Sequence, residues 1–221
     1  AMCSKPLSPR HVETADTHSL AHELRTPISN LLTQTQVVLT QPRDATTYRD
    51  TLASNAEEFQ RLSRMVSDML FLAKAEHGLA LPHREPIDLH TELQALFDFY
   101  DALAEDHHLS LQLTGTAHTE GDRLMVRRAA SNLLSNALRH ATPGTCIRVN
   151  LAQSAAQALV SVRNVGTPIP ADQLPRLFDR FYRADKARSH NGAHPEDGTG
   201  LGLPITRAIM TAHGGTVHAT S

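Results

Sequence analysis

Two stretches near the N-terminus carry mainly apolar residues at alternating steps of three and four. This spacing places their side chains on one face of an α-helix. The first runs from about Thr14 to Gln41 and the second from about Thr46 to His77. Pro42 should end the first helix and Gly78 the second. The predicted seam positions are Leu20, Leu24, Ile28, Leu31, Thr35 and Val38 in the first helix, and Phe59, Leu62, Val66, Met69 and Ala73 in the second.

Two long helices joined by a short turn predict an antiparallel hairpin. A hairpin alone cannot cover seams of this length on both members, so we expect two copies of the chain to pair into a dimeric four-helix bundle. Packing of the hairpin against the rest of its own chain is the alternative.

The pattern changes after residues 79–86, where two prolines and little periodicity predict a linker. Short apolar runs then alternate with helical spacing, which predicts an α/β sandwich; the tight stretch Ala155–Gln157 favours an antiparallel strand pair within a mixed sheet. Asp122 is placed to cap one of the helices. The expected strands are Ile87–Leu89, Leu109–Leu113, Cys146–Ala152 and Leu159–Asn164, and the expected helices are His90–Glu105, Arg123–Ala141 and Leu201–Ala212.

The fold class expected from this pattern is α+β, with four parts along the chain. Residues 1–13 are expected to be a linker or cloning remnant, 14–78 a helical dimerisation domain, 79–86 a linker and 87–221 the α/β domain. A truncated C-terminal end of the α/β domain is one of the alternatives.

Composition narrows the class of protein. The 221 residues are 40% hydrophobic and 20% charged, as in ordinary globular domains, and only 4% are aromatic. A formal net charge of −2 gives no basic field for a phosphate backbone, so we expect no nucleic-acid partner. Two distant cysteines predict reduced thiols in a reducing compartment, and no apolar run approaches the ~18 residues that span a bilayer.

The string His-Glu-Leu-Arg-Thr-Pro at 22–27 lies inside the first predicted helix. At about 100° per residue, His22 lies about 200° from both Leu20 and Leu24, so we expect its imidazole to face solvent. A neutral, exposed imidazole is a nucleophile, and Glu23 could accept or orient its other ring proton. Pro27 should bend the helix.

Asn132 and Asn136 are four residues apart on a predicted helix and therefore share a face, with Arg139 close by. Amide oxygens are hard ligands suited to Mg²⁺, and a guanidinium adds positive charge against a polyphosphate. In isolation these side chains could equally be surface asparagines.

Three further segments have the composition of a nucleotide site. Asn164 follows a strand and could accept a hydrogen bond from an adenine amino group, and Gly166 would let a ligand approach the backbone. The glycine-rich run 198–203 precedes a helix, where free N–H groups bind anions. Phe178 and Phe181 are expected to anchor a lid formed by residues 185–197.

In chain order these five segments resemble the boxes of the cytoplasmic core of sensor histidine kinases, most closely in the heavy-metal-sensing branch. The resemblance implies a GHKL-type ATP-binding domain, with two departures from the usual Asp-x-Gly-x-Gly-Ile pattern: Asn164 replaces the Asp and Pro168 the second Gly. Because Asn accepts less strongly than a carboxylate, nucleotide affinity should be weakened. The resemblance also implies a strand after Gly215, expected to be unpaired at Thr216–Ala219.

The resemblance implies that His22 is phosphorylated, that Glu23 is its acid/base partner and that Thr26 positions the water that dephosphorylates a regulator. It implies ATP and Mg²⁺ as cofactors, with Asn136 and Asn132 as metal ligands. The implied ATP-binding residues are Asn132, Asn136, Arg139, His140, Asn164, Gly166, Ile169, Tyr182, Arg183, Gly198, Thr199, Gly200, Leu201, Gly202 and Leu203.

The expected function is therefore ATP-dependent autophosphorylation of a homodimer on His22, followed by phosphotransfer to an aspartate of a cognate response regulator and its dephosphorylation. The expected location is the cytoplasmic portion of an inner-membrane sensor, attached through a sensor region absent from this sequence. The alternatives are a GHKL-superfamily ATPase and a scaffold that no longer binds nucleotide. A metal-binding module, raised by the 14 histidines, is disfavoured because they are scattered.

Overall fold

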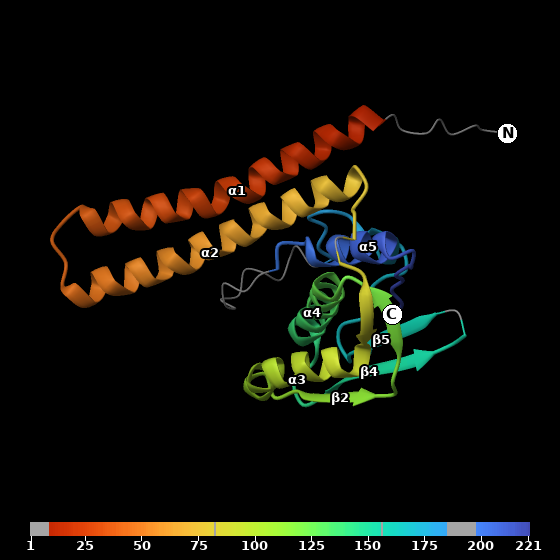
Figure 1. The fold of residues 1–221 in the computed structure, drawn as a ribbon. Coiled ribbons are helices and arrows are strands. Elements are labelled where there is room, and N and C mark those ends of the chain that lie inside the picture. The colour runs from red at the N-terminus through yellow and green to blue at the C-terminus, as the bar shows by residue number, and fades with distance from the viewer. Residues whose placement is uncertain (1–8, 82, 156, 185–197) are drawn as a thin grey trace. The chain divides into compact units, whose positions relative to one another are not determined.

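The computed structural model describes residues 9–81, 83–155, 157–184 and 198–221, with side chains from Glu23 onward. The chain forms two compact units, Ala1–Leu70 and Phe71–Ser221, so the division falls inside a helix. Figure 1 shows a helical hairpin and an α/β unit, which are described separately below.

The hairpin consists of α1 (Pro9–Leu39) and α2 (Ala45–Glu76), within a few residues of the predicted bounds except at the start of α1. Asp44 caps α2, because its carboxylate accepts from the backbone N–H of Thr47 at 2.7 Å and from the Thr47 hydroxyl at 3.1 Å. The backbone N–H of Thr47 is the main cause of a lowered pKa for Asp44. The turn between the helices is thus fixed by a local polar cap.

The hairpin of one chain covers its predicted seam only in part. Leu31 is buried, but Ile28, Phe59 and Val66 are 53%, 61% and 45% exposed, and Ala73 is exposed as well. The buried side of α2 within its first unit is instead marked by Asn55, whose amide donates to the Thr35 hydroxyl at 3.1 Å, and by Met65, which is 1% exposed. Leu62 and Met69 of the predicted seam are half-buried, so the contact within the hairpin runs along one edge of that seam.

The α/β unit contains the helices and strands predicted between residues 87 and 212, and adds a short strand and a 3₁₀ helix that the sequence pattern did not predict. Its elements are β1 (Glu85–Asp88), α3 (Leu89–Asp106), β2 (Ser110–Thr114), β3 (His118–Gly121), α4 (Arg123–His140), β4 (Cys146–Gln153), β5 (Ala158–Arg163), η1 (Leu174–Phe178) and α5 (Gly202–Ala212).

The main sheet has the order β2-β4-β5 and is mixed, as predicted: β2 runs parallel to β4, and β5 runs antiparallel to it. A second sheet pairs β1 with β3. The inward residues of β4, namely Ile147, Val149 and Leu151, are at most 3% exposed, whereas the residues between them are exposed. This alternation shows that one face of the sheet is covered. Leu93 of α3 and Leu134 of α4 pack in the same core as Val149 and Leu151.

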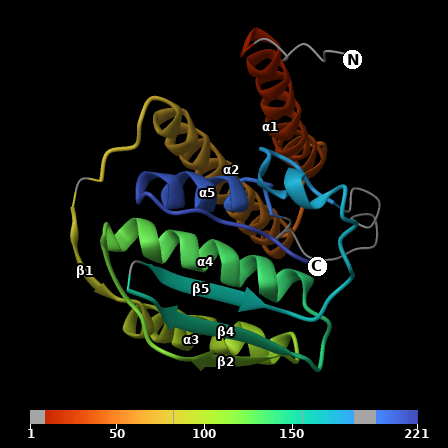
Figure 2. The ribbon, with the colours of Figure 1, turned by 90° about the vertical axis from the view of Figure 1, so that its right-hand side faces the viewer.

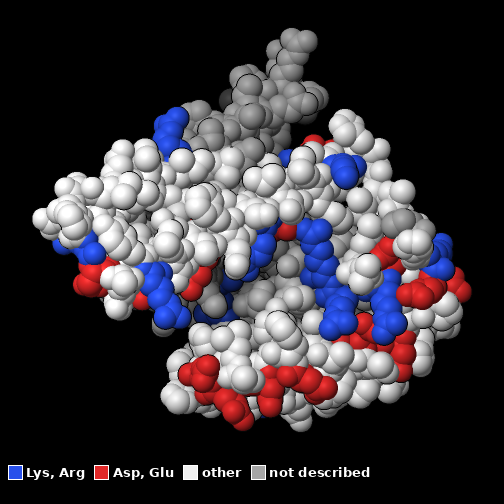
Figure 3. Space-filling view, turned by 60° about the vertical axis from the view of Figure 1, so that its left-hand side comes forward, with Lys and Arg blue, Asp and Glu red and all other residues white. Residues whose placement is uncertain are grey.

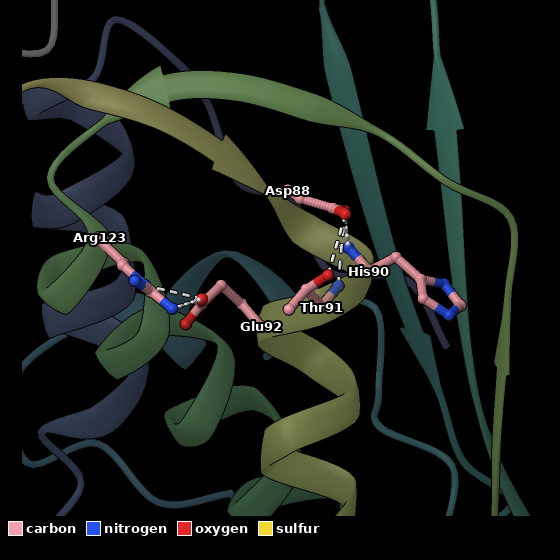
Figure 4. Close-up of polar contacts among 5 residues, drawn as sticks. All are labelled: Asp88, His90, Thr91, Glu92 and Arg123. Atoms are coloured by element: carbon pink, nitrogen blue, oxygen red, sulfur yellow. Dashed lines mark hydrogen bonds and ion pairs between the residues drawn. The ribbon is translucent and has the colours of Figure 1, made fainter.

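Helices α4 and α5 lie side by side above the strands in Figure 2. The start of α4 is capped by Asp122, as predicted, because its carboxylate accepts from the Met125 N–H at 3.0 Å. Beside this cap, Arg123 forms an ion pair at 2.6 Å with Glu92 of α3, whose side chain is nearly buried (Figure 4). This pair raises the pKa of Arg123. The start of α4 is therefore held to α3 as well as capped.

Residues 216–219, expected to be a strand without a partner, have no assigned secondary structure. A strand is stabilised by a hydrogen-bonded neighbour, and no part of the chain that the structure describes pairs with this segment. Within the same described residues, none of the helices has both the length and the apolar character needed to cross a membrane.

Removing the cap of α3 should weaken the α/β unit in a pH-dependent way. Asp88 accepts from the His90 N–H at 2.9 Å and from the Thr91 hydroxyl at 2.9 Å (Figure 4). The Thr91 hydroxyl is the main cause that lowers the pKa of Asp88 from its ordinary 3.8. Asp88→Ala should therefore unfold at a lower temperature at neutral pH. Because the lowered pKa belongs to the folded state, the contribution of the carboxylate is complete above 3.8 and is lost as the pH falls through the folded-state pKa.

Thermal melts followed by circular dichroism, at neutral pH and below pH 3.8, measure this difference. Asp101→Ala is the matched control, since Asp101 is an exposed acid on the same helix. A gap between wild type and Asp88→Ala that stays equally wide in acid would contradict the argument.

Candidate functional site

Helix α4 holds two asparagines on the side away from the core. Asn132 and Asn136 are half-buried, while Leu134 and Leu138 are 1% and 3% exposed and pack inside. The amide nitrogen of Asn132 donates to the carbonyl oxygen of Gly202 at 3.0 Å. The first residue of α5 is therefore bonded to the middle of α4.

The C-terminal end of α4 meets two other predicted segments. The guanidinium of Arg139 lies against Gly198, so closely that a Cβ on this glycine would overlap it. The carbonyl of His140 lies against Gly166 in the same way. Just beyond the helix, the N–H of Thr142 donates to the Val165 carbonyl at 2.7 Å. The end of β5 and the glycine-rich run are thus both drawn to the end of α4.

The aromatic segment joins the same place through the backbone. Phe181 donates its N–H to the Gly200 carbonyl at 3.1 Å. Gly200 has a φ of +69°, and a Cβ here would lie 2.9 Å from the Phe181 Cα, so only glycine fits without strain. Phe181 itself has a φ of +59°, a conformation rare for an aromatic residue.

Phe178 and Phe181 are 8% and 7% exposed, as anchors of this segment should be. Tyr182 and Arg183 are half-buried, and the Arg176 guanidinium lies 4.4 Å from the centre of the Tyr182 ring. Arg176 was not singled out from the sequence; a cation five or six positions from an aromatic residue in a short turn carries no pattern that predicts the contact. The predicted lid, residues 185–197, lies outside the described residues.

The N-terminus of α5 has the form of an anion site. Leu201 is fully buried, Thr199 and Leu203 are half-buried, and no described side chain caps the helix. The first N–H groups of a helix have no partners within the helix, and the positive end of the helix dipole favours negative charge. With Arg139 beside Gly198, this end of α5 fits a phosphate chain.

The adenine-box residues lie at the end of β5. Asn164 is exposed, and its amide nitrogen lies 3.1 Å from the position of a Cβ on Gly166. Ile169 is half-buried and donates its N–H to the Ser221 hydroxyl at 2.8 Å. Asn164 therefore stands beside the glycine that approaches α4, with its side chain accessible to a ligand.

In the hairpin unit, His22 lies within α1, but its side chain is outside the described residues, so its solvent-facing orientation stays a prediction. Glu23 is half-buried and Thr26 is exposed. Pro27 is buried one turn further on, and α1 continues through it to Leu39.

Charge is mixed on the surface. The face in Figure 3 carries both basic and acidic side chains, without one continuous field of a single sign over the residues described there. Among the described residues, no three His, Cys, Asp or Glu side chains gather to hold a metal ion.

Comparison with known proteins matches two family models. Residues 17–78 match the His Kinase A (phospho-acceptor) domain, and residues 121–221 match the histidine kinase-, DNA gyrase B-, and HSP90-like ATPase. Sensor histidine kinase CusS of Escherichia coli O157:H7 is 49% identical over 91% of this chain and 41% of its own length. Sensor protein CzcS of Cupriavidus metallidurans is 39% identical over 91% of this chain and 42% of its own length.

The fold is also found in a solved structure. The crystal structure of histidine kinase ThkA in complex with response regulator protein TrrA has a TM-score of 0.72 at 19% identity, over 94% of this chain and 57% of that one. The chain spans about two fifths of the length of the curated relatives it matches. With a phospho-acceptor helical region followed by a kinase-type ATPase domain, in the order that the sequence motifs predicted, the chain belongs to the sensor histidine kinase family.

Proposed function

We propose that this chain uses ATP to phosphorylate His22 and passes the phosphoryl group to an aspartate of a response regulator. The observation that carries the proposal is that four segments far apart in the sequence contact one another. These are the end of α4, the end of β5, the run 198–203 and the segment around Phe181. Each segment presents a group that a nucleoside triphosphate needs, namely amides, a guanidinium, a polar strand end and unpaired helical N–H groups.

Mg²⁺ is proposed to bind with ATP at α4. Asn136 would supply an amide oxygen, and Asn132 could contribute only its Oδ1, because its Nδ2 is a donor already bonded to the Gly202 carbonyl. The metal would neutralise charge on the phosphates. Arg139, His140, Tyr182 and Arg183 are proposed to orient the nucleotide from the rim of the same place.

Glu23 is proposed to take or orient the proton of the His22 ring while the other ring nitrogen attacks the terminal phosphorus. The P–N bond forms as the bond from phosphorus to the bridging oxygen breaks, and ADP leaves with the electron pair. Thr26, exposed on the same helix, is proposed to position the water that later dephosphorylates the regulator.

The assembly and setting of the chain are part of the proposal. The exposed apolar side chains of α2, among them Phe59 and Val66, support pairing with a second copy into a four-helix bundle. The relatives are named as sensor proteins, which supports placing this chain on the cytoplasmic side of a membrane sensor, and the resemblance to the heavy-metal-sensing branch supports a metal ion as stimulus.

Two alternatives remain distinguishable by experiment. An ATPase of the same superfamily would release free phosphate without forming phosphohistidine, and the His22 motif is what disfavours it. A scaffold would bind no nucleotide, and the replacements at Asn164 and Pro168 are what keep this alternative open.

Replacing the acceptor should remove labelling without removing nucleotide binding. His22→Gln should incorporate no radiolabel from [γ-³²P]ATP, because its amide is not a nucleophile for phosphorus. The wild-type label should be lost in acid and retained in base, as expected for a phosphoramidate. His118→Gln, an exposed histidine in the α/β unit, is the control and should label normally. Label that persists in His22→Gln would overturn the assignment.

Restoring the acidic residue at the adenine box should strengthen binding. Asn164→Asp offers a carboxylate in place of an amide oxygen, and charge-assisted hydrogen bonds are roughly twice as strong as neutral ones. We expect the Kd of a fluorescent ATP analogue to fall severalfold. Asn150→Asp adds the same charge on the exposed face of β4 and should leave the Kd unchanged. A Kd that rises in Asn164→Asp would show that this residue does not accept from the base.

A side chain at Gly200 should disturb the nucleotide site through Phe181. Gly200→Ala forces a left-handed backbone on alanine and places its Cβ 2.9 Å from the Phe181 Cα. The expected strain is about 1–3 kcal/mol, and the chain can relieve it by moving the segment around Phe181. That movement should weaken nucleotide binding by on the order of tenfold. The measurement is a titration with the fluorescent analogue.

Gly144→Ala is the matched control, since Gly144 has a φ of +81° but open space around its Cβ position. This variant should lose some stability while binding nucleotide normally. Equal binding by both variants would show that the contact between Gly200 and Phe181 does not shape the site.

A further inference from the structure

At the C-terminal end of α5, both ring nitrogens of His213 have partners. Nδ1 lies 2.8 Å from the carbonyl oxygen of Ile209, one turn earlier in the same helix. Nε2 lies 3.0 Å from the backbone nitrogen of Asp122, which is 91 residues away in sequence. His213 therefore bonds the end of α5 to the residue that caps α4.

These two contacts are satisfied together by one form of the ring. The Ile209 carbonyl can only accept, so Nδ1 must carry the proton. The N–H of Asp122 can only donate, so Nε2 must offer its lone pair. The neutral Nδ1–H tautomer makes both bonds, whereas the other tautomer makes neither.

The end of β3 lies directly against the imidazole ring of His213. A Cβ on Gly121 would overlap the imidazole, so the glycine lets the ring approach the backbone of Asp122. Asp122 is 4% exposed, and its own carboxylate is used by the Met125 N–H. Without His213, the buried N–H of Asp122 would lose its partner, and unpaired buried donors are costly.

Two hydrogen bonds between α4 and α5 bear on their register, and the bond from the Asp122 N–H to His213 is one of them. The other is the bond from Asn132 to Gly202 at the opposite end of α5. The two points are separated by about 15 Å along α4 and about 17 Å along α5, at ~1.5 Å per residue. Because the spacings match on the two neighbouring antiparallel helices (Figure 2), bonds at both ends fix the register of one helix on the other.

This register decides where the nucleotide groups lie. Helix α4 carries Asn136 and Arg139, and α5 begins at Gly202, within the glycine-rich run. The contact between Arg139 and Gly198 is close enough that a Cβ would overlap the guanidinium. A shift of α5 along α4 would move Gly198 relative to Arg139 and so change the shape of the phosphate site.

We propose that His213 is a positioning residue for ATP binding, which fixes α5 on α4 through the Asp122 N–H and so sets the separation of the phosphate loop from Asn136 and Arg139. The inference rests on the proposed function. His213 contacts none of the groups proposed to touch nucleotide, and it acts through the start of α4.

The test compares three replacements at this position in the full chain. His213→Phe keeps a ring but has no acceptor, and His213→Ala has neither ring nor acceptor. His213→Gln keeps an oxygen at the reach of Nε2, which can accept from Asp122. We expect the Kd for a fluorescent ATP analogue and the KM for ATP in autophosphorylation to rise about tenfold in His213→Phe and His213→Ala, as for loss of one buried hydrogen bond. The Gln variant should stay within about threefold of wild type, and kcat should change little in all three.

A second line of evidence separates positioning from stability. Binding is measured at a temperature at which urea denaturation shows that each variant is folded. A further variant, Gly121→Ala, displaces the His213 ring without changing its chemistry. Gly121→Ala should raise the Kd as His213→Phe does, while Gly215→Ala, whose Cβ would only touch the Met210 carbonyl at 3.4 Å, should not. Nitrogen NMR should show the Nδ1–H tautomer in the wild type.

The outcomes are distinct. Wild-type protein that binds no nucleotide would refute the proposed function itself. Wild-type protein that binds normally, together with folded His213→Phe of equal Kd, would overturn the positioning role alone. A Gln variant as weak as the Phe variant would show that the acceptor to Asp122 is not what matters, and would also overturn the inference.

Discussion

The α/β site depends on glycines whose backbone lies in close contact with neighbouring groups. Gly166 lies against the His140 carbonyl, Gly198 against the Arg139 guanidinium and Gly200 against the Phe181 backbone. At Gly166 and Gly200 a Cβ would meet the backbone of another segment, whereas at Gly198 it would displace the end of the Arg139 side chain. The glycines therefore do more than leave room for phosphate: they let the end of α4, the end of β5 and the start of α5 close on one another. The nucleotide groups follow from that closure.

Elements set by local interactions could be predicted from the sequence, and elements set by a partner could not. The helix after Asp122 was predicted almost to the residue, because the cap and the 3.6-residue period both lie within the segment. Strand β3 was missed, because His118–Gly121 has no apolar alternation and exists through pairing with β1. Residues 216–219, expected to be a strand without a partner, have neither a paired neighbour in the described structure nor an assigned secondary structure.

The hairpin shows the same limit within a helix whose existence was never in question. Helix α2 carries apolar residues at adjacent positions, such as Met65 and Val66, and periodicity alone does not decide which of them faces α1. The choice between them depends on where α1 lies, and the bond from Asn55 to Thr35 shows the side that faces it. The exposed row that includes Phe59 is then left for another surface. A sequence thus specifies how many faces a helix must bury before it specifies which neighbour buries each.

The site residues divide along a similar line. Asn132, Arg139 and the glycine-rich run could be singled out because their chemistry and spacing match what a nucleotide requires, and the structure does bring them together. His213 offers no such chemistry in sequence, since a single histidine at a helix end has many uses. Its importance lies in a bond across 91 residues to a backbone N–H, which no pattern of side chains could encode. Residues that hold a binding site in shape are chosen by the geometry of their neighbours, so they become visible only when the fold places those neighbours beside them. Helix α5 illustrates this at both ends: Gly202 is recognisable in the motif, and the histidine that holds the opposite end in register is not.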